Sequence, residues 1–247
     1  MTLKHVDFEV PNFGELASGP VNKPGYRAVV LAMNPRAYWR LGESSGSVAA
    51  DQTGQHNGSY LGGVTLGEAG AVPFDANTAV RFNGSTGRVL IADVLDFAGT
   101  APFSLLAWAK PTTLTGAAQQ VLQKRSNTVG TRNGYVLGLG TSNVWQVARW
   151  VSDTANAVSG PTATANTWVH LVGTYTGSQL RLYVNNTAFG PVTSSGSVAN
   201  VSDPLTLGVN SVQSAAFWNG LIDEVAIFDF ALSAAQVAEL YRTGVAR

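Results

Sequence analysis

Cysteine is absent from the sequence, so no disulfide bond can stabilise the fold and no thiolate can act as a nucleophile or a metal ligand. Charged residues are scarce, at 12% of the 247 positions, and the 15 basic residues are balanced by 15 acidic ones. A chain without an excess of either charge has little to attract nucleic acid or an anionic membrane surface. We therefore expect neither nucleic acid nor a membrane among its partners.

Long apolar runs are also missing, and no window of the sequence has the length of a membrane-spanning helix. The first ten residues alternate polar and apolar side chains, and they lack the apolar stretch of a secretory signal. We therefore expect a protein that is made in a cytoplasm and carries no export signal.

What the sequence does contain is glycine, at 27 positions, with many threonine, serine and valine residues, a composition typical of short strands joined by tight turns. From residue 37 onward, about a dozen strand candidates are separated by turn signals. Residues 179–185, for example, alternate apolar and polar side chains, as a strand with one solvent-exposed face does. We predict an all-β domain over residues 35–247, built as a two-sheet antiparallel jelly-roll sandwich.

The first 34 residues differ from the rest of the chain. Residues 6–10 alternate like a strand, and prolines and glycines then interrupt an irregular stretch. Residues 26–33 are apolar and stand between Pro24 and Pro35, which is the placement of prolines around a short helix. Because this segment is too small to form its own core, we predict that residues 1–34 are an extended N-terminal arm or linker.

The C-terminal residues combine a turn, a strand and a helix. Asn219-Gly220 favours a tight turn, and the residues after it are apolar on both faces of the expected strand. Ser233 with Gln236 three residues later fits a capping box. We therefore predict a short C-terminal helix packed on a sheet.

Six motifs follow one another in order along the chain. They are Tyr-Trp-Arg-Leu-Gly-Glu at 38–43, Asp-Gln-Thr-Gly-Gln-His-Asn-Gly at 51–58, Val-Arg-Phe-Asn-Gly at 80–84, Phe-Ser-Leu-Leu-Ala-Trp-Ala-Lys-Pro at 103–111, the paired segments 168–175 and 180–186, and Gly-Leu-Ile-Asp-Glu-Val at 220–225. Together they resemble the laminin-G-like, concanavalin-A-like jelly-roll family, close to its pentraxin-related branch. The resemblance implies the sandwich fold but not one function, because this family supplies adhesion, glycan-binding and architectural modules alike.

A catalytic constellation is not visible in the sequence. Glucanases of the same fold carry two carboxylates on one strand face, where they supply the nucleophile and the general acid. The nearest approach here is Asp223 and Glu224, and simple alternation along a strand places these neighbours on opposite faces. We therefore predict that the protein is not an enzyme.

Asp223 is the ionisable residue that most needs a partner, because alternation places it on one face with Val225 and Ile227. Either loop backbone amides donate hydrogen bonds to it, or it binds a cation. Members of the resembled family often bind calcium, and Glu43 and Asp51 lie in opening segments that could approach this strand. Because the chain lacks a dense run of Asp and Asn, we rank hydrogen bonding first and a calcium site formed by Asp223, Glu43 and Asp51 second.

Aromatic rings are the usual platforms for sugars. Trp145 and Trp150 stand five positions apart on one expected strand, so they project to opposite faces, and one of them is a candidate for exposure. Trp218, at the turn before the last strand, is the third candidate, although a tryptophan at such a turn more often covers the edge of the core. The aromatic candidates for ligand or partner contact are therefore Trp218, Trp150 and Trp145.

Two functions follow from the resemblance and the arm. The first is a non-enzymatic structural protein of a bacteriophage virion, either a capsid decoration protein or a minor tail protein, because virion proteins often resemble an arm followed by an Ala-Tyr-Trp-Arg-Leu-Gly-Glu module. The arm would then mediate self-association and contacts with major capsid or tail proteins by adding strands to their sheet edges. The alternative is a lectin-like adhesion module that recognises host-surface glycans and acts at a cell surface or outside the cell.

Overall fold

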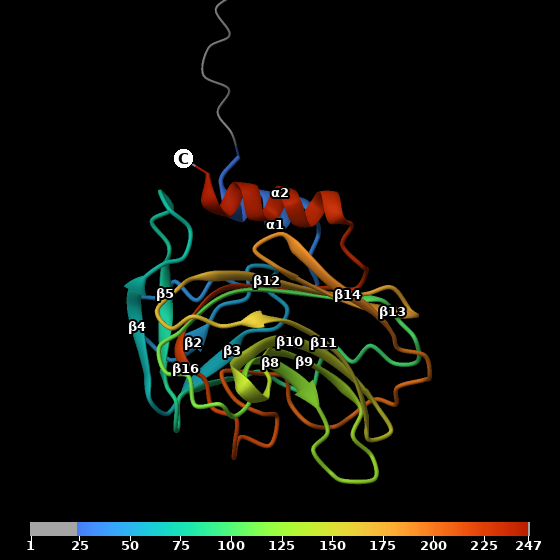
Figure 1. The fold of residues 1–247 in the computed structure, drawn as a ribbon. Helices are drawn as coiled ribbons and strands as arrows, with labels where there is room; N and C mark the ends of the chain where they lie inside the picture. The colour runs from blue at the N-terminus through green and yellow to red at the C-terminus, as the bar shows by residue number, and fades with distance from the viewer. Residues whose placement is uncertain (1–23, 247) are drawn as a thin grey trace, which may run out of the picture.

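Two antiparallel sheets packed face to face form most of the structure, a computed structural model that describes residues 24–246 (Figure 1). The first sheet has the order β14 (Thr187–Thr193), β13 (Gln179–Val184), β12 (Val169–Tyr175), β7 (Phe103–Pro111), β16 (Asn219–Phe228), β5 (Thr78–Asn83) and β4 (Val64–Ala69), with β1 (Ala37–Trp39) also paired to β16. The second sheet has the order β11 (Thr154–Thr162), β10 (Val144–Val151), β9 (Gly134–Leu139), β8 (Gln119–Arg125), β15 (Thr206–Leu207), β6 (Arg88–Leu90), β3 (Gly58–Leu61) and β2 (Val48–Ala49). The predicted jelly-roll sandwich is confirmed.

The main hydrophobic core fills the space between the two sheets. Leu105 and Leu171 of the first sheet and Leu137 and Val147 of the second belong to it, and all four are completely buried. Since side chains alternate along a strand, every second residue of β9 and β10 points away from this core. In β8 the pairing shifts between Gln120 and Leu122, so Val121 and Leu122 both belong to the core, while Gln120 and Gln123 line the outer face. The outer face of the second sheet is therefore a surface on which these strands can build a site.

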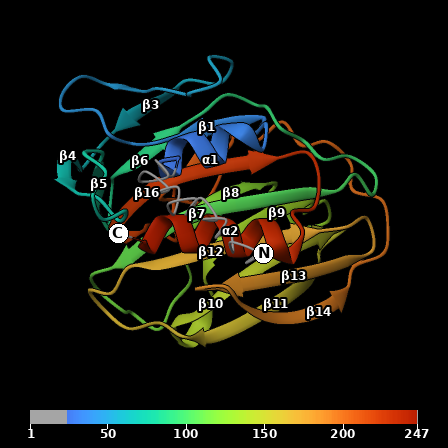
Figure 2. The same cartoon turned by 90° about the horizontal axis from the view of Figure 1, so that it is seen from above.

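Two helices cover the outer face of the first sheet, α1 (Tyr26–Ala32) and α2 (Ala234–Val245), and both lie over this sheet in Figures 1 and 2. Tyr26 of α1 and Leu240 of α2 pack with Trp108 of β7 in a second, smaller core. The central strand β7 is thus covered on both faces, which explains its nearly continuous apolar sequence. Within residues 24–246, no helix is long and apolar enough to cross a membrane.

The predicted arm falls into two parts. Residues 1–23, with the strand expected over 6–10, lie outside the described residues. The apolar segment after Pro24 is the helix α1, as expected, but Tyr26 and Val30 of this helix are buried in the second core. The segment 24–34 is therefore packed on the sandwich and does not extend away from it, because its apolar face needs the cover that α2 and β7 provide.

Helix α2 begins with the capping box that the sequence predicts. The hydroxyl of Ser233 accepts a hydrogen bond from the backbone N–H of Gln236, and the Gln236 side chain accepts one from the backbone N–H of Ser233 at 2.9 Å. Two otherwise unpaired donors at the helix start are satisfied in this way.

Replacing Ser233 with alanine removes one of these hydrogen bonds. We expect Ser233→Ala to lower the free energy of unfolding by about 1 kcal/mol, as measured by urea denaturation. The matched control is Ser178→Ala, at an exposed turn position, for which we expect a change below about 0.5 kcal/mol. Equal effects of the two substitutions would contradict a capping role.

Strand β16 contains a β-bulge that the sequence does not predict. Ile222, Val225 and Ile227 all belong to the main core. Regular alternation would leave one residue between two inward-facing ones, but Asp223 and Glu224 both stand between Ile222 and Val225. The pairing with β7 shifts at the same place, and Glu224 has a positive φ of 51°. The expectations that Asp223 shares a face with Val225 and that Asp223 and Glu224 point to opposite faces were therefore wrong.

Candidate functional site

A groove of about 370 Å³ lies on the outer face of the second sheet, over β8, β9 and β10. Gln120 and Gln123 of β8 and Gln146 of β10 line it, together with Trp150 and Asn210. An amide side chain both donates and accepts hydrogen bonds, and such groups orient a ligand that carries hydroxyl groups. These amide groups are therefore suited to a polar, hydroxyl-bearing surface such as that of a sugar.

The register of the strands places these side chains in rows across the sheet. The rows are Arg125, Gly134 and Trp150; Gln123, Val136 and Ala148; and Gln120, Gly138 and Gln146. The middle strand β9 thus gives this face only two glycines and one valine. These small side chains form the floor of the groove, and the longer side chains of β8 and β10 form its walls. At Gly134, with a φ of 120°, a β-carbon would lie 2.1 Å from the backbone oxygen of Lys124, so the floor cannot carry a side chain there.

Gln123 is the most unusual residue of the groove. It is completely buried, yet neither its side-chain nitrogen nor its side-chain oxygen has a hydrogen-bond partner. A buried polar group without a partner costs on the order of 1–3 kcal/mol, and native proteins keep few of them.

Trp150 lies at one end of the groove, and two arginines approach its ring. It is half-buried, and the Arg125 guanidinium lies over its ring with the central carbon 4.4 Å from the ring centroid. The corresponding distance from Arg132 is 5.7 Å. These are cation–π distances, so the tryptophan face already has a guanidinium on it and acts as a support for arginine rather than as a bare platform.

Burial raises the electrostatic cost of the Arg125 charge. Desolvation, and then the neighbouring positive charge of Arg132, lowers the pKa of Arg125 below its ordinary value. The Arg125 side chain donates a hydrogen bond to the amide oxygen of Asn127, while its Nε is buried without a partner. The groove therefore ends at a guanidinium that still lacks one acceptor.

The other two tryptophan candidates lie in the main core. Trp145 and Trp218 are almost completely buried, and their ring centroids are 6.1 Å apart. The indole N–H of Trp218 donates to the backbone oxygen of Leu221 at 3.2 Å. Neither ring can meet a ligand, which agrees with the expectation that Trp145 and Trp150 project to opposite faces and corrects the candidacy of Trp218 and Trp145.

The three residues of the predicted calcium site are not brought together. In residues 24–246, no group of three His, Asp or Glu side chains is placed to hold a metal ion. Asp51 accepts hydrogen bonds from the backbone amides of Tyr38, Thr53 and His56 at 2.8–2.9 Å, and these bonds lower its pKa although burial acts to raise it. Glu43 accepts from the backbone of Ala50 and the hydroxyl of Tyr60.

Asp223 belongs to a different buried network. Its carboxylate accepts from the backbone amide of Ala71 at 2.8 Å and from the side chain of Asn77 at 3.0 Å, which is the hydrogen bonding that we ranked first. Burial, followed by the charge of the adjacent Glu224, raises the pKa of Asp223. The bulge thus places both carboxylates in one network, but both are completely buried and cannot reach a substrate.

Glu224 is the centre of this network. It accepts hydrogen bonds from the hydroxyl of Tyr38 and, at 2.7 and 3.0 Å, from two nitrogens of Arg40. The same guanidinium reaches Asp75 at 2.7 Å. Burial raises the pKa of Glu224, and the hydrogen bonds from Arg40 and Tyr38 act in the opposite direction. The network joins β1, β16 and the segment before β5, so its function is structural.

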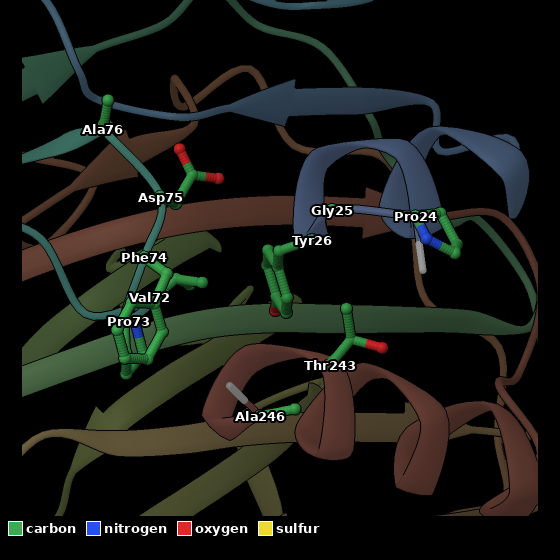
Figure 3. Close-up of a pocket in the computed structure, with 10 residues that line it drawn as sticks. All are labelled: Pro24, Gly25, Tyr26, Val72, Pro73, Phe74, Asp75, Ala76, Thr243 and Ala246. Atoms are coloured by element: carbon green, nitrogen blue, oxygen red, sulfur yellow. The ribbon is translucent and has the colours of Figure 1, made fainter. Parts of the chain in front are cut away.

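A second hollow, of about 310 Å³, lies beside the helices (Figure 3). Its walls come from the start of α1, residues 72–76 and the end of α2, and they are largely apolar. Its carboxylate, Asp75, already pairs with Arg40. This hollow therefore offers a ligand fewer hydrogen-bonding groups than the groove on the second sheet does.

The fold is that of a two-sheet jelly-roll domain. A family model described as the concanavalin A-like lectin/glucanases superfamily matches residues 83–238. This match covers more than half of the chain, and the chain belongs to that superfamily. No curated protein matches the chain in sequence.

Several solved structures share the fold. The binding domain of Paraclostridial Mosquitocidal Protein 1 matches with a TM-score of 0.67 and 13% identity over 86% of this chain and 53% of that chain. The binding domain of botulinum neurotoxin serotype G matches with a TM-score of 0.62 and 13% identity over 84% of this chain and 50% of that chain. A third match is domain 4 of AbnA, a GH43 extracellular arabinanase from Geobacillus stearothermophilus, in complex with arabinotriose. Its TM-score is 0.55, with 20% identity over 83% of this chain and 97% of that chain. The likeness concerns the fold, and the chain covers about half the length of the two toxin domains.

Proposed function

We propose that the protein is a non-enzymatic carbohydrate-binding module that holds a glycan in the groove over β8, β9 and β10. The observation that carries this proposal is the set of amide side chains along the groove, with the buried amide of Gln123 left unsatisfied. Glycan hydroxyl groups both donate and accept hydrogen bonds, and they match amide groups in this respect. The complex of the arabinanase domain with arabinotriose, and the binding domains of the two toxins, support a ligand-binding role for this fold.

The lining of the groove supports binding without catalysis. Glycoside cleavage commonly needs two carboxyl groups that flank the scissile bond. Of the described residues that line the groove, none is Asp, Glu or His. A glycan in this position would therefore be held by hydrogen bonds and released unchanged.

The first test is a glycan array followed by calorimetry on the glycans that bind. We expect Trp150→Ala to weaken binding by about tenfold or more, because Arg125 loses its support, and Gln146→Ala to weaken it by about two- to tenfold through one lost hydrogen bond. The matched control is Trp168→Ala, because Trp168 is also half-buried and carries Lys110 at 5.1 Å, but it packs beside the helices. Absence of any glycan ligand, or equal losses from Trp150→Ala and Trp168→Ala, would overturn the proposal.

A structural role in a bacteriophage virion stays a prediction from the sequence, as do the capsid or tail partners and the virion location. Most of the arm on which this role depends lies outside the described residues. The two roles are compatible, because a glycan-binding module can be carried on a virus tail. Calcium binding likewise stays a prediction, and the binding test should be run with calcium and with a chelator.

A further inference from the structure

Unsatisfied hydrogen-bonding atoms are concentrated in and beside the groove. In the described residues, eight buried side-chain nitrogen or oxygen atoms lack a partner, and five of them belong to Gln123, Arg125, Asn127 and Arg132. Four of these five atoms are nitrogen donors, and the single acceptor is the amide oxygen of Gln123. A local surplus of donors indicates a ligand that brings acceptor oxygens.

The charge at the Trp150 end of the groove also favours a ligand that brings acceptor oxygens. Arg125 is the one charged side chain among the described residues that line the groove, and Arg132 approaches the same tryptophan ring. Two carboxylates lie nearby, since Asp153 is 3.9 Å from Nε of Arg132 and Asp203 acts on Arg125 through its charge. Neither carboxylate lines the groove, so a ligand in the groove meets a positive charge.

The Arg125 guanidinium lies over the Trp150 ring. Its central carbon is 4.4 Å from the ring centroid, and one of its terminal nitrogens donates to Asn127. A carboxylate matches the edge of a guanidinium with two parallel, charge-assisted N–H···O bonds. A neutral sugar has no negatively charged group to offer there.

Building on the proposed function, we propose that the glycan is acidic and that a sugar carboxylate pairs with Arg125 beside Trp150. The hydroxyl groups of the same sugar or of its neighbour then bind the amides of Gln120 and Gln146. Arg125 sets the preference for acidic sugars, and the amide groups supply binding that neutral sugars share.

The test compares matched acidic and neutral glycans by calorimetry. The pairs are trigalacturonic acid with its methyl ester, and sialyllactose with lactose, and a heparin-derived tetrasaccharide tests for a general preference for anions. We expect one acid to bind the wild-type protein about ten- to a hundredfold more tightly than its neutral partner. Arg125→Gln should remove this difference. Arg125→Lys, which keeps the charge but not the planar pair of donors, should lose only part of it.

Arg81→Gln is the matched control, since Arg81 pairs with Glu68 on the first sheet, away from the groove, and thermal melting checks that every variant is folded. Equal binding of acidic and neutral glycans, with loss on Trp150→Ala but not on Arg125→Gln, would overturn the acidic preference and leave the proposed function standing. Preference for the sulfated tetrasaccharide over both carboxylates would also overturn it. Absence of binding to every glycan would refute the proposed function itself.

Discussion

Arg40→Leu is expected to lower the free energy of unfolding by about 3–5 kcal/mol at pH 7.5, because the substitution leaves the completely buried carboxylate of Glu224 without its cation. The hydroxyl of Tyr38 would remain as a donor to Glu224, but a hydroxyl does not neutralise the charge of the carboxylate. Urea denaturation monitored by tryptophan fluorescence gives this quantity directly.

The pH dependence of this loss distinguishes electrostatics from packing. A buried carboxyl group with a raised pKa contributes stability at low pH that disappears as the pH rises through its folded-state pKa. Without Arg40 the pKa of Glu224 should rise further, so protonation relieves the buried charge and the loss should shrink at pH 5.

Two companion variants make this prediction specific. Arg81→Leu breaks an ion pair with Glu68 that is partly exposed, and it should cost less than about 1 kcal/mol. The double variant Arg40→Leu/Glu224→Gln should recover part of the loss, because it removes the uncompensated charge. Equal losses of unfolding free energy for Arg40→Leu and Arg81→Leu would contradict this prediction, because the buried ion pair would then stabilise the fold no more than a partly exposed one.

Acidification should destabilise the wild-type protein through His170. This side chain is completely buried, both of its ring nitrogens lack a partner, and its ring lies 5.0 Å from that of Trp108 and 5.8 Å from that of Tyr241. Burial lowers the pKa of His170 to about 3. The imidazole is therefore neutral in the folded protein over the ordinary range of pH.

The sign of the effect follows from the two states. In the unfolded chain a histidine binds a proton below about pH 6.5. Between that value and about 3 the unfolded state holds one more proton at this site, so stability falls as the pH falls, by about 1.4 kcal/mol per unit. From pH 7.5 to pH 4.5 the contribution of His170 should amount to about 2.7 kcal/mol.

His170→Phe isolates this contribution. Asp223 and Glu224, whose pKa values are raised by burial, change stability in the opposite direction, but they are present in both proteins and cancel in the comparison. When the pH falls from 7.5 to 4.5, we expect the free energy of unfolding of His170→Phe to fall by about 2.7 kcal/mol less than that of the wild-type protein. Val172→Ala, which lies on the same strand in the same small core, should lower stability without changing the pH dependence.

Much of the fold could be predicted from local patterns. The alternating strands and the capping box act over a few residues, and each appears in the structure where the sequence places it. The tight turn expected at Asn219-Gly220 does not form, because both residues belong to β16 and pair with β5. The bulge in β16 could not be predicted in this way, because the sequence at Asp223 and Glu224 carries no glycine or other signal of a positive φ. The packing of α1 on α2 depends likewise on a contact between opposite ends of the chain.

The candidate site was visible only in part. Trp150 was a candidate because of its spacing from Trp145, but nothing marked Gln123, since a single glutamine in a strand is ordinarily a solvated side chain. The groove arises from the register of β8, β9 and β10, which sets Gln123 and Arg125 opposite small residues of β9. The spacing of Gly134 and Gly138 on that strand is the sequence signal that could have indicated a low floor.

The two ends of the described chain share one location. Pro24 and Ala246 both line the hollow beside α1 and α2, over the first sheet, whereas the groove lies on the outer face of the second sheet (Figures 1 and 3). Attachment through the helix side would therefore leave the groove pointing outward. Copies held on a common support could then engage several sugars of one surface at once, and avidity would turn weak single contacts into durable adhesion.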